Sequence, residues 1–113
     1  MSESGDPTFP IREKAAAFEN VVTGTSCNQS SFKTKRGSFF FAGPGAKGVG
    51  FKAMFKLKAS MPQAQALAKD MPSRFEVGST GWVTTRFSTK DPLPKEIWEK
   101  WLEESYLITE KKI

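Results

Sequence analysis

The sequence has no histidine, a single cysteine and no long hydrophobic run, and each absence excludes a class of function. Without histidine the chain lacks imidazole as a general base, as the partner of a nucleophilic Ser or Cys, and as a metal ligand. With Cys27 as its one thiol it can form no internal disulfide, and a zinc site is close to impossible. No apolar run approaches the ~18 residues of a membrane-spanning helix.

These absences lead to a set of negative expectations. We expect a protein that is not an enzyme, with no cofactor, no metal and no membrane association. The start of the chain, MSESGDPTFP, is polar and contains two acids, so we expect no signal peptide. Because disulfides are the rule in oxidising compartments and are missing here, the expected location is cytoplasmic.

Acidic residues are missing from the middle of the chain. The span from Asn20 to Lys69 has no Asp or Glu, whereas its eight Lys and Arg residues give it a charge of +8. Residues 1–19 and 70–113 have charges of −2 and −1, so the net charge is 8 − 2 − 1 = +5. A basic middle between mildly acidic ends predicts a positive face that attracts polyanions or acidic proteins.

What is present is the pattern of a single α+β domain over residues 8–113, after a flexible tail at 1–7. A first helix, capped by Thr8 or Asp6, is predicted to end near Asn20, and residues 23–31 are predicted to be a loop. Further helices are predicted from Ser60 to Pro72 and from about Pro94 to Tyr106. The predicted strands lie at 30–34, 38–42, 51–58, 74–77 and 82–87.

The third strand, 51-FKAMFKLK-58, alternates strictly between its two faces. Phenylalanine, alanine and leucine share one face, while Lys52, Met54, Lys56 and Lys58 share the other. The expected order is α-β-β-β-α-β-β-α, with a mostly antiparallel sheet and helices packed on one face. The other face should be open and should present Lys52, Lys56 and Lys58 beside Lys33 and Lys35.

Three local motifs allow more than one interpretation. The loop 43-GPGAKG-48 matches G-x-G-x-x-G, but a strand follows it, so a flexible hairpin loop is favoured over a phosphate site. The segment 36-RGSFFF-41 resembles an RNA-binding strand only loosely. Because strand side chains alternate, Phe40 should point opposite to Phe39 and Phe41, which favours a buried strand over a stacking platform. Ser60 and Gln63 form a capping box.

The last predicted helix combines a tryptophan face with a glutamate face. Trp98 and Trp101 should pack in the core. Glu99 and Glu103 lie one turn apart and could hold a cation, but the lysines among them favour surface salt bridges.

The basic middle supplies the candidate binding residues. Two interpretations remain open for it: contacts to nucleic-acid phosphates, or a solvated lysine-rich sheet that resists aggregation. An acidic protein partner is the alternative to DNA or RNA. The candidate nucleic-acid-binding residues are Lys33, Lys35, Arg36, Lys47, Lys52, Lys56 and Lys58.

Four segments resemble the MmcQ/YjbR-like family over about residues 11–108. They are FKTKRGSFFFAGPG, FKAMFKL, VGSTGWVTTRF and WLEESYLI. The resemblance implies a CyaY-like α+β fold with a "double wing" arrangement of hairpins, and members of the family are often described as DNA-binding. It implies no catalytic residues. This chain departs from the family at Leu107, where a basic residue is common, and in the loop at 23–31.

Overall fold

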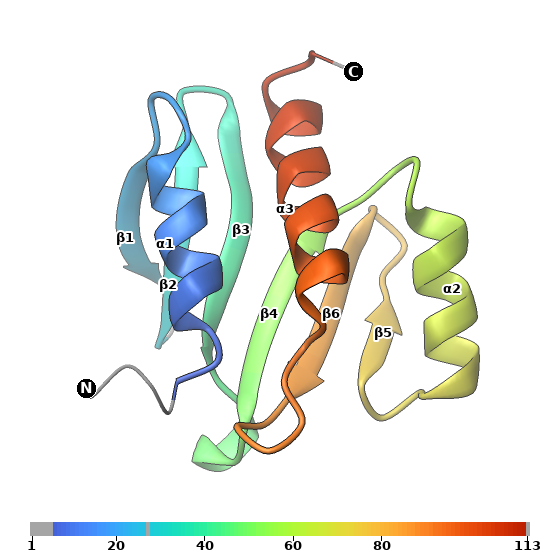
Figure 1. The fold of residues 1–113 in the computed structure, drawn as a ribbon. Helices are drawn as coiled ribbons and strands as arrows, with labels where there is room; N and C mark the ends of the chain where they lie inside the picture. Colours follow the sequence, from blue (N-terminus) through green and yellow to red (C-terminus); the bar gives the residue numbers. More distant parts are fainter. Residues whose placement is uncertain (1–5, 27, 113) are drawn as a thin grey trace.

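The computed structural model describes residues 6–26 and 28–112 of the chain. Its elements confirm an α+β fold in the order α-β-β-β-β-α-β-β-α, one strand more than expected (Figure 1). The helices are α1 (Phe9–Ala17), α2 (Met61–Asp70) and α3 (Lys95–Thr109). The strands are β1 (Val22–Ser26), β2 (Gln29–Thr34), β3 (Gly37–Pro44), β4 (Phe51–Lys56), β5 (Phe75–Val77) and β6 (Trp82–Phe87), and the 3-10 turn η2 (Ala46–Gly48) joins β3 to β4.

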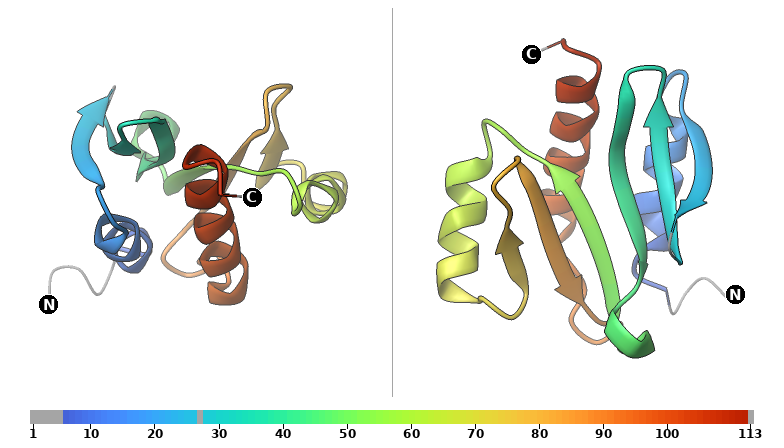
Figure 2. Two further views of the ribbon diagram at one scale, coloured as in Figure 1. Left: turned by 90° about the horizontal axis from the view of Figure 1, so that it is seen from above. Right: turned by 180° about the vertical axis from the view of Figure 1, so that it is seen from behind.

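All six strands form one antiparallel sheet in the order β1-β2-β3-β4-β6-β5. Helices α1 and α3 lie on one face of it, and α2 lies beside β5 at one edge (Figure 2). Seen from behind, the other face of the sheet is covered by none of the described helices. The predicted open face is therefore present.

Strand β1 occupies the segment that was predicted to be the end of a helix and a loop. Helix α1 ends at Ala17 because Phe18 adopts an extended backbone and Asn20 a left-handed one (φ 63°). Val22, which lies just beyond the predicted end of the helix, begins β1 and is 59% exposed. The backbone of β1 pairs with β2, and its β-branched residues Val22, Thr23 and Thr25 favour a strand, a signal that the loop prediction overlooked.

Phe39 and Phe40 are both fully buried, which contradicts the prediction that they point to opposite faces. The reason is a bulge in β3: Phe32 pairs with Phe40 while the next residue of β2 pairs with Ser38, so Phe39 has no partner. A bulge inserts an extra residue and breaks the alternation of side chains. Phe39 then contacts Tyr106 of α3, Phe40 contacts Phe55 of β4, and only Phe41 faces the open side.

Ser105 of α3 joins β3 and β4 through hydrogen bonds. β3 and β4 diverge beyond the pair Phe40–Phe55 (Figure 2), and there the Ser105 hydroxyl donates to the carbonyl of Phe39 and accepts the N–H of Lys56 at 2.8 Å. Ser105 therefore replaces a missing hydrogen bond between the two strands and fixes the direction of β4.

The carboxylate of Glu104 caps the turn after β4. It accepts the N–H groups of Lys58 and Ser60 at 2.7 and 3.0 Å and the Ser60 hydroxyl at 2.6 Å. Burial disfavours the charge, but these bonds outweigh it, so the pKa of Glu104 lies below its usual 4.5. The predicted capping box is wrong, because Ser60 bonds to Glu104 and Gln63 accepts the indole N–H of Trp101 at 3.0 Å.

Candidate nucleic-acid interface

The open face of the sheet presents lysines from two strands. Lys52 and Lys56 alternate along β4 with the fully buried Ala53 and Phe55 and therefore point away from the helices. On β2, Phe32 lies in the core and Thr34 donates to Glu110, the residue that follows α3, so Lys33 between them faces the open side, where it is exposed. These three residues confirm the predicted orientation of the basic strands. We call Lys33, Lys52 and Lys56 the open-face lysines.

Two aromatic rings lie among these lysines. Phe41 of β3 pairs with Met54 of β4, and Trp82 of β6 pairs with Lys56. The ring centroids of Phe41 and Trp82 are 5.5 Å apart, with 51° between the ring planes, so the two rings meet across β4. Phe41, Met54 and Trp82 are all half-buried. The centre of the open face is therefore apolar and aromatic, with cationic groups around it.

The same face has a fourth base and one acid near the β5 edge. Arg86 of β6 lies directly opposite Lys52, an arrangement of like charges that is unfavourable across an antiparallel pair. The guanidinium of Arg86 is 2.8 Å from the carboxylate of Glu76 on β5. This ion pair offsets the repulsion, and Lys52 forms no ion pair with the part of the chain that the structure describes.

The other four predicted binding residues lie outside the open face. Lys35 and Arg36 form the β2–β3 turn, so Lys35 does not share a strand face with Lys33 as predicted. Lys58 follows the end of β4, where its N–H is bound to Glu104. The β2–β3 turn and the end of β4 point to the same end of the sheet, whereas Lys47 lies in η2 at the opposite end (Figure 1). Lys47 is therefore separated from the rest of the basic set.

No carboxylate of the described residues forms an ion pair with this basic set. Among residues 6–26 and 28–112, the ion pairs are Arg12–Asp6, Arg74–Asp91 and Arg86–Glu76. None of the seven predicted binding residues takes part in them. The open-face lysines thus lie free on the surface, and a polyanion can approach them without displacing a carboxylate.

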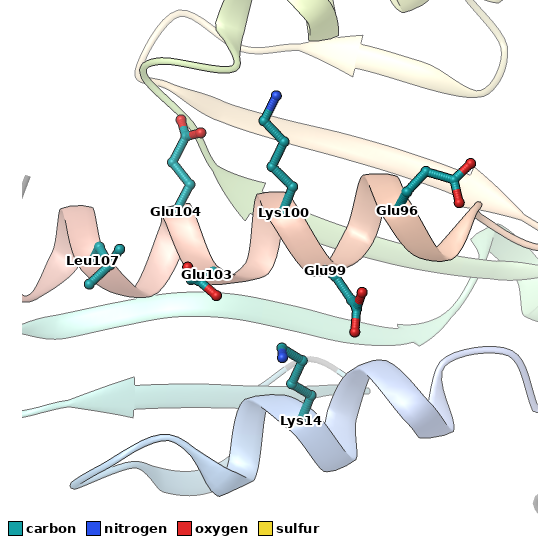
Figure 3. Close-up of a pocket in the computed structure, with 7 residues that line it drawn as sticks. All are labelled: Lys14, Glu96, Glu99, Lys100, Glu103, Glu104 and Leu107. Carbon is teal, nitrogen blue, oxygen red and sulfur yellow. The ribbon is translucent and has the colours of Figure 1, made fainter.

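The acids lie mainly on the helical side. Figure 3 shows the residues that line a groove along α3. Lys14 of α1 lies on one side of it, and the lining residues of α3 include Glu96, Glu99 and Glu103. The predicted salt bridges of these glutamates are absent from the described part of the chain. That part also has no group of three or more acidic or cysteine side chains placed to hold a metal ion. The molecule thus has a basic open face opposite an acidic helix.

The glycine-rich loop has a structural explanation. Gly45 donates its N–H to the carbonyl of Gly50 at 3.0 Å, and its missing side chain leaves room for the carbonyl of Val49, which lies 2.1 Å from where a Cβ would be. β4 follows the loop, so no helix N-terminus faces it. The hairpin-loop interpretation of this motif fits the geometry.

Sequence reasoning missed Trp82 and Arg86 as open-face residues. The signal was available in 82-WVTTRF-87, which alternates as β4 does: Val83, Thr85 and Phe87 are buried while the residues between them face the open side. Phe41 was named only as one of three phenylalanines, because the bulge in β3 could not be read from the sequence.

Comparisons with models of protein families, with curated proteins and with solved structures find no match to this chain. The MmcQ/YjbR-like resemblance therefore stays a prediction. Within the described residues, none of the helices is long and apolar enough to cross a membrane. Cys27 lies outside the described residues.

Proposed function

We propose that this protein is a binding module, not an enzyme, whose open sheet face contacts the phosphate backbone of a nucleic acid in the cytoplasm. The observation that supports the proposal most strongly is the set of three open-face lysines, which surround two aromatic rings and have no carboxylate partner in the described chain. Each lysine that neutralises a phosphate releases bound counterions, which is the main driving force for backbone binding.

The charge distribution gives the approaching polymer one preferred side. The segment from Val22 to Ser60, which contains β1 to β4, has seven bases and no acid, for a charge of +7. Helix α3, on the other face, has two lysines and four glutamates, for a charge of −2. A polyanion is attracted to the open face and repelled by the helical face. Lys35, Arg36 and Lys58, at one end of the sheet, extend the path of the backbone beyond the open face.

An acidic protein is the competing partner, and it would meet the same lysines. For a nucleic acid, the dependence of affinity on salt concentration follows from the number of phosphate contacts. Phosphate contacts give a linear fall of log K with log salt, with a slope of about −0.7 per contact for a single strand. Three open-face lysines therefore predict a slope of about −2, or about 20-fold weaker binding between 50 and 200 mM salt.

Fluorescence anisotropy with a labelled oligonucleotide tests the proposal. The double variant Lys52→Glu/Lys56→Glu should lose binding at about 50 mM salt. The matched control is Lys90→Glu/Lys95→Glu, which changes the net charge equally, from +5 to +1, at exposed positions in the loop after β6 and in α3. If both double variants weaken binding equally, net charge alone explains it. If the wild-type protein binds neither DNA nor RNA at low salt, the proposal is wrong.

A further inference from the structure

We infer that the open face is built for single-stranded nucleic acid, with unpaired bases stacked on the rings of Phe41 and Trp82. This inference rests on the proposed function and adds to it the class of polymer. The rings, rather than the lysines, are the feature that distinguishes a single strand from a duplex.

The half-buried aromatic rings of this chain are Phe9, Phe18, Phe41, Phe51 and Trp82, and of these Phe41 and Trp82 lie on the open face. Phe39, Phe40 and Phe55 are fully buried, and Trp98 and Trp101 are only 7% and 0% exposed. The fold thus has a core that accepts large aromatic side chains. Phe41 and Trp82 instead remain half-buried on the face that none of the described helices covers.

The rings and lysines are arranged as a stacking platform between phosphate contacts. Lys52 and Lys56 lie four residues apart on β4, which is about 13 Å along the strand. Met54 lies between them, Phe41 lies opposite Met54 on β3, and Trp82 lies opposite Lys56 on β6. Base–aromatic stacking tolerates any sequence because every base has a π-face, and basic grooves with such rings are typical of single-strand binders.

A duplex cannot use this platform. Its bases are paired and stacked on one another, so their π-faces are not accessible to a ring on a flat sheet. Proteins that read the bases of a duplex in its major groove insert an α-helix or a two-stranded β-ribbon. Helices α1 and α3 lie on the opposite face, so the duplex would have only phosphate contacts with the open-face lysines.

The test compares a short thymidine oligomer with a duplex of the same length, using tryptophan fluorescence and anisotropy. Stacking should quench Trp82 when the single strand binds. Trp82→Leu should abolish that quenching and weaken single-strand binding about five- to a hundred-fold, with duplex binding unchanged. Trp82→Phe, which keeps a ring, should retain most of the affinity. Phe9→Leu is the matched control: it removes a half-buried ring from α1, which lies on the opposite face of the sheet, and it should leave single-strand binding unchanged.

The outcomes separate this inference from the proposed function. If Trp82→Leu binds the single strand as tightly as the wild-type protein, while Lys52→Glu/Lys56→Glu loses it, the proposed function stands and the stacking inference is wrong. Equal affinity for single strand and duplex also overturns the inference. If no oligomer binds, both fail. Thermal unfolding of each variant checks that the fold is retained.

Discussion

Glu104 provides the sharpest test of how α3 positions the sheet, through the substitution Glu104→Gln. Its side chain is 8% exposed and accepts three hydrogen bonds, from the N–H of Lys58 and from the N–H and hydroxyl of Ser60. A hydrogen bond to a charged group contributes about 1.5–3 kcal/mol, and a neutral one about 1. The glutamine keeps the shape but loses the charge. Because a neutral amide is less costly to bury, part of that loss is offset, and we expect about 1–2 kcal/mol of destabilisation at neutral pH.

The effect of pH follows from the direction of the pKa shift. The folded-state pKa of Glu104 lies below its usual value of 4.5, so the carboxylate stabilises the fold fully above pH 4.5. That contribution is lost as the pH falls through the folded-state pKa. The difference in unfolding free energy between wild-type protein and Glu104→Gln should therefore shrink steadily at acidic pH. Asp6, whose pKa is also lowered, is present in both proteins and cancels.

Urea unfolding, followed by tryptophan fluorescence, measures both quantities. The matched control is Glu103→Gln, which makes the same chemical change one residue earlier on the exposed side of α3 and should cost less than about 0.5 kcal/mol. The reasoning is refuted if the two variants are destabilised equally, or if the effect of Glu104→Gln persists unchanged in acid.

Two further predictions concern the backbone around β3 and β4. Ser105→Ala leaves the carbonyl of Phe39 and the N–H of Lys56 without their buried partner. The free energy of unfolding, measured in urea, should therefore fall by about 2–4 kcal/mol. A fall of less than about 0.5 kcal/mol would mean that the strands pair directly without the hydroxyl. Gly45→Ala places a Cβ 2.1 Å from the carbonyl of Val49 and should cost about 1–3 kcal/mol in the same assay. Gly48→Ala, with φ +75° but open space around it, should cost only about 1 kcal/mol, and equal costs would contradict the steric argument.

The strands that alternate strictly were predictable from the sequence. In β4, every second residue is lysine or methionine, and burial of the residues between them fixes which face is open. The hairpin turn with Gly37 and the helix that ends before Pro72 were equally clear, because glycine and proline restrict the backbone locally. The fold class and the open face followed from these signals.

The remaining features depend on contacts between distant residues. β1 is stabilised because its backbone meets β2, and the β-branched Val22, Thr23 and Thr25 alone do not show which strand they pair with. The buried side of Phe39 depends on the bulge, and the role of Ser60 depends on Glu104, which lies 44 residues away. Nothing in the sequence distinguishes Glu104 from the exposed glutamates of α3. Local alternation therefore gives the open-face lysines and, in 82-WVTTRF-87, also the face of Trp82, while the contact between Trp82 and Phe41 depends on which strands are neighbours.

The most direct test of the central claim is an NMR titration of the ¹⁵N-labelled protein with a thymidine oligomer. The proposed interface predicts that the largest amide shift changes fall on β2, β3, β4 and β6, at and next to Lys33, Phe41, Lys52, Lys56 and Trp82, together with the indole N–H of Trp82. The outward face of α3 should be unaffected. Changes concentrated on α1 and α3, or no changes at low salt, would contradict the claim that the open sheet face binds nucleic acid.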